Sequence, residues 1–196
     1  MTGWWRRNRW ALLALLALVP ASVLASSYRY VTLYLPVHSP PVVRADKGTV
    51  AFDRQIVESR TVTYRSTFTV HLDHAGPAHD PATKAANGAT LWRADLTFEA
   101  SPDVPITCSG FRLLDGEGRE YASGAAVTSE DRLNWASCVP LDAPGPTFTF
   151  DGKPVPPDVP RPASWRVPVW FAVPNGVTPD RLRISLPGYD VEFAVP

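Results

Sequence analysis

The sequence predicts an all-β fold, an antiparallel β-sandwich preceded by one N-terminal apolar helix. Residues 10–25 form an uncharged hydrophobic run, and after residue 35 apolar and polar side chains alternate at a period of two rather than 3.6. In addition, 21 prolines are spread along the 196 residues. Because proline is excluded from helix interiors and central strands, this spread indicates short extended segments separated by loops.

The N-terminal segment has the charge pattern of a membrane signal. Arg6, Arg7 and Arg9 precede the hydrophobic run, and a basic flank stays on the cytoplasmic side of a membrane. Aromatic residues, which favour the two membrane surfaces, flank both ends of the run: Trp4, Trp5, Trp10, Tyr28, Tyr30 and Tyr34. We therefore expect a cytoplasmic basic tail at residues 1–9, a signal-anchor transmembrane helix at 10–30, and everything beyond it outside the cytoplasm.

A cleaved signal peptide is the alternative interpretation of the same segment. Its apolar core at 10–19 has a suitable length, Pro20 can end the helix, and Val23 and Ala25 are small residues at the −3 and −1 positions. Cleavage following Ala25 would release a secreted domain that begins at Ser26. A lipid anchor is not expected, because serine rather than cysteine follows the run.

A linker at residues 31–44 and one extracytoplasmic β-sandwich domain at residues 45–196 account for the rest of the chain. The length after the first 35 residues, about 160, suffices for one hydrophobic core. Period-two alternation predicts half-buried strands within these ranges: 61–72, 92–100, 147–150, 165–173, 182–186 and 191–195. Pro168 indicates that its strand lies at a sheet edge. Seven or eight such strands with turns between them are typical of an immunoglobulin-like sandwich.

Glycine and proline indicate the turns and loops. Asp115-Gly116-Glu117-Gly118 predicts a tight turn leading into residues 119–121, which is the signature of a β-hairpin. The alternation slips within residues 106–114, and Gly110 at the slip predicts a β-bulge. Two longer stretches without hydrophobic period, at 73–88 and 139–162, are expected to be loops.

Cys108 and Cys138 are the two cysteines of the chain, and both lie in the part predicted to be exported. In an oxidising compartment two such thiols are expected to form one disulfide. Their spacing matches neither a CxxC redox motif nor a zinc site. We therefore predict a structural disulfide, which would stabilise the domain by roughly 3.5 kcal/mol through loop closure.

Three stretches of the sequence resemble a known group of domains. They are CSGFRLLDGEGREY at residues 108–121, WFAVP at 170–174 and PDRLRI at 179–184. Over residues 45–196 the chain resembles the uncharacterised immunoglobulin-like domains, of unknown function, found in exported and membrane-anchored actinobacterial proteins. This resemblance implies an immunoglobulin-like fold and an exported location. It implies no catalytic residue, because the matching motifs are a hairpin and two strands.

Charge and motifs argue against several classes of function. Lysine plus arginine and aspartate plus glutamate balance at 19 each without a basic face, so no nucleic-acid partner is expected. The sequence has no GxSxG elbow, HExxH motif or phosphate-binding glycine loop, so we expect neither an enzyme nor a cofactor. An unrecognised hydrolase is one alternative.

One cluster has metal-binding chemistry: His71, Asp73, His74 and His79. Histidine and carboxylate side chains are competent ligands for zinc or copper. His71 and Asp73 share the polar face if their strand continues, but no sequence feature returns His74 and His79 to that face. A solvent-exposed strand end and loop is the favoured interpretation, and an envelope metal-binding protein is the second alternative function.

Trp135 and Trp170 are the candidates for an exposed binding surface. Large aromatic residues on alternating strands usually fill the core, but Trp170 has the opposite parity from Phe171, and Trp135 lies in a loop. We therefore expect a non-enzymatic domain, anchored to the membrane by its N-terminal helix, that serves as a binding or accessory module for an envelope protein or a surface component.

Overall fold

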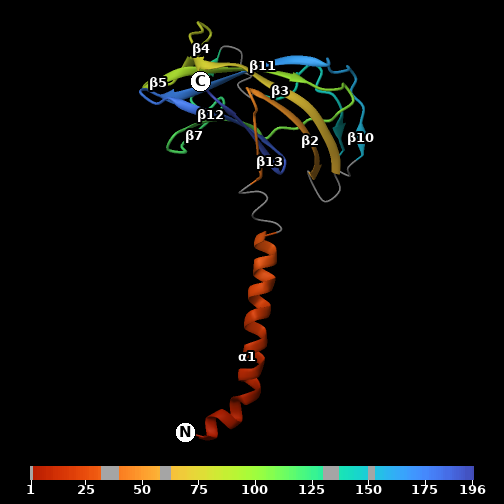
Figure 1. The fold of residues 1–196 in the computed structure, drawn as a ribbon, viewed down its shortest axis with the longest axis vertical. Helices are drawn as coiled ribbons and strands as arrows, with labels where there is room; N and C mark the ends of the chain where they lie inside the picture. The colour runs from red at the N-terminus through yellow and green to blue at the C-terminus, as the bar shows by residue number, and fades with distance from the viewer. Residues whose placement is uncertain (1, 32–39, 58–62, 130–136, 150–152) are drawn as a thin grey trace. The chain divides into compact units, whose positions relative to one another are not determined.

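A computed structural model of the chain describes residues 2–31, 40–57, 63–129, 137–149 and 153–196 (Figure 1). The chain divides into two compact units, Met1–Pro41 and Val42–Pro196. The first unit contains the helix α1, and the second contains every strand of the described residues. The all-β class predicted for the domain is confirmed, as is the single apolar helix before it.

Helix α1 (Thr2–Arg29) contains the hydrophobic run. Its segment Arg7–Tyr28 is long and apolar enough to span a membrane, with a mean hydropathy of 2.0. A signal sequence has the same length and composition, so the helix is compatible with both interpretations of this segment. Pro20 lies inside α1, and the helix continues beyond it, whereas the signal-peptide interpretation expected the helix to end there.

The strands of the described domain are β1 (Val42–Arg44), β2 (Thr49–Val57), β3 (Thr63–Pro77), β4 (Thr83–Ala85), β5 (Ala89–Glu99), β6 (Gly110–Asp115), β7 (Glu120–Ala122), β8 (Val127–Ser129), β9 (Thr147–Phe148), β10 (Pro154–Val155), β11 (Ser164–Pro174), β12 (Pro179–Leu186) and β13 (Tyr189–Ala194).

Two larger sheets form the domain (Figure 1). The five-stranded sheet has the order β1-β13-β12-β6-β7, with β1 parallel to β13 and the other pairs antiparallel. The four-stranded sheet has the antiparallel order β11-β5-β3-β2. Strand β12 thus lies between β6 and β13, and β5 lies between β3 and β11. The arrangement is consistent with a sandwich, and the immunoglobulin-like topology stays a prediction.

The hydrophobic core is one cluster that draws side chains from both sheets. In the four-stranded sheet, Phe98 stacks on Trp165 at 5.7 Å between ring centroids. Across the sheets, Phe52 meets the edge of Tyr189, also at 5.7 Å. Because complete burial of one large apolar side chain contributes about 1.5–3 kcal/mol, this shared core is what holds the sheets together. Pro168 lies on β11, which is an edge strand as predicted.

The boundaries of the predicted linker and loops are wrong in part. Val42–Arg44, placed in the predicted linker at 31–44, forms β1 and pairs with β13. The predicted loop from residue 73 is also too long, because β3 continues to Pro77 through a register shift between Leu72 and His74. An inserted bulge residue breaks the period-two pattern while backbone pairing continues, which explains why this strand end looked like a loop.

Gly110 is the first residue of β6, with φ of 147°, a conformation that favours glycine. It pairs with Ser185 on β12, and the N–H of the preceding Ser109 donates to the Ser185 carbonyl oxygen at 2.7 Å, so two residues face one at the predicted bulge. A register shift also lies on β12, between Pro179 and Arg181. The break in the period-two pattern within residues 106–114 marks the start of β6, because residues 105–109 belong to no strand.

Candidate binding site

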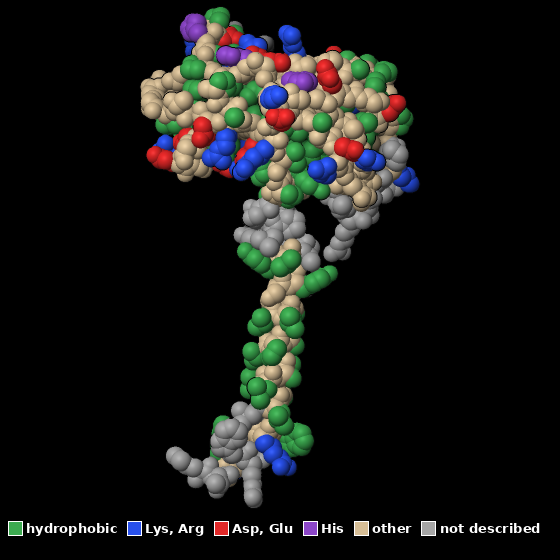
Figure 2. Space-filling model, viewed as in Figure 1, with side chains coloured by type: hydrophobic (Ala, Val, Ile, Leu, Met, Phe, Trp, Pro, Cys, Tyr) green, Lys and Arg blue, Asp and Glu red, His purple; other side chains and the backbone are tan. Residues whose placement is uncertain are grey.

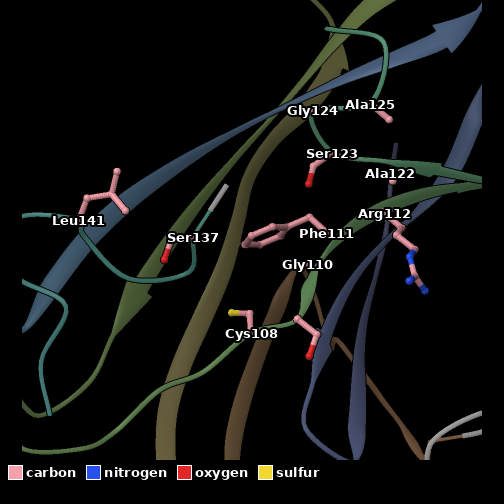
Figure 3. Close-up of a pocket in the computed structure, with 11 residues that line it drawn as sticks. Cys108, Gly110, Phe111, Arg112, Ala122, Ser123, Gly124, Ala125, Ser137 and Leu141 are labelled. Atoms are coloured by element: carbon pink, nitrogen blue, oxygen red, sulfur yellow. The ribbon is translucent and has the colours of Figure 1, made fainter. Parts of the chain in front are cut away.

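A half-open pocket of about 690 Å³ lies between β6 and the segment at residues 137–141 (Figure 3). Its volume falls within the range of small-molecule pockets. Much of the lining is small or bears a hydroxyl group: Ser109, Gly110, Ser123, Gly124 and Ser137. Figure 3 shows the Phe111 ring lying between Ser123 and Ser137. The pocket therefore presents hydroxyl groups and glycine backbone, with the buried Phe111 side chain beneath them.

The turn at residues 122–126 forms one wall of the pocket and joins the two sheets. The Ser123 N–H donates to the Phe111 carbonyl oxygen on β6 at 3.0 Å, and the Gly124 N–H donates to the Trp170 carbonyl oxygen on β11 at 3.0 Å. Ala126 ends the turn with φ of 56°, an unfavourable conformation for a residue other than glycine. These bonds hold the turn in one position across the open edge of the sandwich.

The predicted disulfide forms a second wall. Cys108 and Cys138 are bonded, with their Cα atoms 6.0 Å apart, and Cys108 lines the pocket. The Trp165 Nε1–H donates to the carbonyl oxygen of Cys138 at 2.8 Å. The segment at 137–141 contains no strand, and the disulfide, this indole bond and the packing of Cys138 and Val139 against the core attach it to the rest of the domain.

From within the domain, Arg161 lies against Trp165, whose indole binds this wall. Its side chain is 1% exposed, and its guanidinium donates to the carbonyl oxygens of Ser101, Val104 and Pro144. The guanidinium also lies over the Trp165 ring, and burial lowers the pKa of Arg161. Its buried Nε has no hydrogen-bond partner among the described residues. We did not predict this role, because nothing in the Pro-rich sequence distinguishes this arginine from a solvated one.

The rim of the pocket carries one apolar and one cationic side chain. Leu141 is 63% exposed, which is unusual for a leucine beside a pocket. Arg112 follows Phe111 on β6 and points away from it (Figure 3), with its Nη1 3.3 Å from Glu120 Oε2. The rim can therefore offer a ligand an apolar contact on one side and a paired charge on the other.

Comparisons of the chain with family models, with curated proteins and with solved structures found no match. The resemblance to immunoglobulin-like domains of exported actinobacterial proteins stays a prediction. Function is therefore argued from the site itself rather than from relatives.

Of the histidine cluster, His71 and Asp73 lie on the outer face of the four-stranded sheet, whereas His79 lies in the segment after β3. The His71 Nδ1 lies 2.8 Å from the Thr49 hydroxyl, and the Thr97 hydroxyl donates to Asp73 at 2.5 Å. His71 pairs in register with Thr97, so His71 and Asp73 lie near each other on that face. His74 and His79 are exposed. Within the described residues no three His, Cys, Asp or Glu side chains could hold a metal ion together.

Trp170 faces outward from β11 and is half-buried. The Arg93 guanidinium lies over its ring at 5.2 Å, and Arg93 is paired with Asp95 at 2.6 Å. One face of the indole is thus already in contact with a cation. Because the Trp170 carbonyl accepts from Gly124, this residue lies directly behind the pocket wall. Trp135, the other predicted surface residue, lies outside the described residues.

The Asp115 carboxylate accounts for the motif at residues 108–121, on which the resemblance to immunoglobulin-like domains partly rests. Its carboxylate accepts hydrogen bonds from the Tyr121 hydroxyl at 2.7 Å, from Arg119 Nε at 2.6 Å, and from the backbone N–H groups of Glu117 and Arg119. Burial alone would raise the pKa of Asp115, but these four bonds hold it well below its usual value of 3.8. Burial and the bond to Asp115 raise the pKa of Tyr121. These bonds fix the turn between β6 and β7, so the residues of this motif serve to form a β-hairpin.

Charges on the five-stranded sheet are also paired. Arg183 contacts Glu192 at 2.7 Å, Glu120 at 2.8 Å and Asp190 at 3.5 Å. Burial would lower the pKa of Arg183, but these carboxylates raise it. Figure 2 shows basic and acidic side chains interspersed over one face of the domain. The face shown there has no continuous basic surface for a nucleic-acid backbone.

Proposed function

We propose that this chain is a non-enzymatic, membrane-anchored extracytoplasmic domain that serves as a binding or accessory module for an envelope protein or surface component. The pocket beside the disulfide is the observation that carries the proposal. It is concave, it combines hydroxyl and backbone groups with an apolar rim at Leu141, and its walls are fixed by covalent and hydrogen bonds. Prearranged walls lower the entropy cost of binding.

Two features support a location outside the cytoplasm. Helix α1 is apolar enough to cross a membrane, and its basic flank favours the cytoplasmic side for residues 1–9. The disulfide is of a kind that persists in oxidising compartments. A single-pass protein in the cell membrane, with the domain at 42–196 outside the cytoplasm, accounts for both features together.

The groups around the pocket favour binding over catalysis. The described lining contains three serines and no His, Asp or Glu that could act as their general base. Arg112 is paired with Glu120, and Asp115 accepts four hydrogen bonds. Small walls such as Gly110 and Gly124 allow a close approach of another backbone, so an extended polypeptide segment is the ligand that we propose.

Site-specific photo-crosslinking in the full-length protein tests this function. A photoreactive amino acid at Ser123 or Ser137, inside the pocket, should yield a discrete adduct with one envelope component in native membranes. The same substitution at Ser164, which is exposed and outside the pocket, should not. Leu141→Asp should reduce the pocket adduct without changing the melting temperature, because Leu141 is exposed. Equal adducts from all three positions, or none from the pocket, would contradict the proposal.

A further inference from the structure

The two sulfur atoms of the disulfide have different surroundings. Cys108 is half-buried and belongs to the pocket lining, and Figure 3 shows its side chain among the other lining residues. Cys138 is 2% exposed, belongs to the hydrophobic core and is not among the described lining residues. A thiol that enters the pocket therefore reaches the sulfur of Cys108 first, because the core encloses Cys138.

The same bond restrains one wall of the pocket. Without the covalent link, the described contacts that hold the segment at 137–141 are the Trp165 hydrogen bond and the packing of Cys138 and Val139. Among the described residues, Cys138 is the only buried member of the core cluster that this segment supplies, whereas most other members lie on the strands of the two sheets. Loss of the bond therefore acts first on the wall and only secondarily on the sheets.

We propose that the Cys108–Cys138 disulfide is a redox switch of the pocket, operated by a dithiol reductant. One thiolate of the reductant attacks Cys108 Sγ through the pocket and forms a mixed disulfide, while the Cys108–Cys138 bond breaks and Cys138 leaves as a thiolate that takes up a proton. The second thiol of the reductant then attacks the reductant sulfur of the mixed disulfide and releases Cys108. Two electrons pass to the protein, so the reductant ends as a disulfide and both cysteines end as thiols.

Reduction removes the fixed position of the wall. Ser137 lines the pocket and Leu141 forms its exposed rim, and both lie on the released segment. A ligand must then order this segment itself, so its affinity falls. The effect on affinity rests on the proposed binding function, whereas the direction of attack and the release of the wall involve no ligand.

A monothiol probe tests the direction of attack. The oxidised full-length protein in detergent is exposed briefly to excess glutathione under native conditions, quenched with N-ethylmaleimide and mapped by peptide mass spectrometry. We expect glutathione on Cys108 and maleimide on Cys138, because Cys138 is the leaving thiolate. The protein has no other cysteine that could react. Equal amounts of glutathione on the two cysteines, or no adduct, would overturn the proposal.

A matched pair of variants tests the route through the pocket. Ser123→Trp fills the pocket and should slow reduction by dithiothreitol about fivefold or more, because thiol–disulfide exchange depends on access to the attacked sulfur. Ser164→Trp places the same side chain at an exposed position outside the pocket and should leave the rate unchanged. Equal rates in the two variants would show that the reductant arrives by another route.

The parent protein gives a second measure of the same route. Its reduction rate should stay almost constant as denaturant is added below the unfolding transition, because attack through the pocket requires no unfolding. A rate that rises with denaturant as steeply as the unfolding equilibrium would show that the sulfur is reached only after the domain unfolds. The switch would then be disproved.

Limited proteolysis tests the release of the wall. After reduction with dithiothreitol, proteinase K should cut within residues 137–141 at least about fivefold faster than in the oxidised protein, while the far-ultraviolet circular dichroism of the sheets is unchanged. Unchanged cutting, or loss of the sheet signal, would overturn the switch. If the wall is released on reduction but the oxidised protein yields no photo-adduct at Ser123 or Ser137, the proposed binding function fails and the redox control of the wall stands.

Discussion

The guanidinium of Arg161 lies over the indole ring of Trp165, with its Cζ 4.7 Å from the ring centroid. The same indole donates to the Cys138 carbonyl oxygen. These contacts connect the Pro-rich part of the chain to the disulfide and to β11. The described contacts of this buried cation are carbonyl dipoles and an aromatic face rather than a carboxylate. The Arg161 side chain thus connects segments that contain no strand, at Ser101, Val104 and Pro144.

Gly145 should tolerate no side chain, because it lies against Arg161. A Cβ there would be 2.7 Å from Arg161 Nη1, and φ is 84°. Gly145→Ala is expected to lower the free energy of unfolding by about 1–3 kcal/mol more than Gly176→Ala. Gly176 has a similar φ of 81° and open space around it, so its substitution measures the cost of the backbone conformation alone. Denaturant unfolding of both variants measures the difference. Equal losses of unfolding free energy would show that the Arg161 side chain can move aside without cost.

The Asp115 hairpin should weaken in acid. The folded-state pKa of Asp115 is depressed, so its contribution to stability is present above the unfolded value of 3.8 and is lost as the pH falls below it. Asp115→Asn should lower the melting temperature at pH 7 and make it less dependent on pH below about 4. Glu117→Gln removes an exposed carboxylate of the same turn and should leave the acid dependence unchanged. An unaltered acid profile in Asp115→Asn would disprove the assignment.

Removal of the disulfide should destabilise the domain strongly. The two cysteines are 30 residues apart, for which loop closure predicts a loss of roughly 3.5 kcal/mol. Chemical denaturation of the Cys108→Ser/Cys138→Ser protein measures this loss against the oxidised parent. The pocket wall at 137–141 should also become more accessible to protease, because only non-covalent contacts, the Trp165 hydrogen bond and the packing of Val139 against the core, then retain it among the described contacts. Resistance equal to that of the parent would contradict this account.

The mature protein should keep residues 1–30 and fractionate with membranes. Aromatic residues flank both ends of the apolar run, and α1 continues past Pro20. Intact-mass measurement of protein from the native host decides the matter. A mature N-terminus at Ser26 would show that the segment is a cleaved signal peptide and that the domain is secreted.

Period-two alternation predicted the strands whose inward residues are uniformly apolar, as in β5, β11, β12 and β13. It missed β2, because Arg54 interrupts an otherwise alternating set of Val50, Phe52 and Ile56. It also missed the three-residue strand β1, whose partner β13 is distant in sequence. Short strands are stabilised by pairing rather than by their own pattern, so single-sequence periodicity carries little information about them.

The pocket was predictable only in part. The cysteine pair that forms one wall followed from composition, and the outward parity of Trp170 followed from its strand. Ser123, Ser137 and Leu141 gave no signal, because a pocket arises from segments that meet only in the folded chain. Arg161 is a similar case. Its role depends on three carbonyl groups and an indole that the tertiary fold brings around it.

The parallel pairing of β1 with β13 has a consequence for the order of folding. Strand β1 is made first, yet its partner is the thirteenth strand, so β1 stays unpaired until β13 has emerged from the ribosome or from a translocation channel. Non-local pairing of this kind slows folding and leaves strand edges exposed to aggregation in the meantime. A nascent chain stalled before residue 189 should therefore need a chaperone that shields Val42–Arg44.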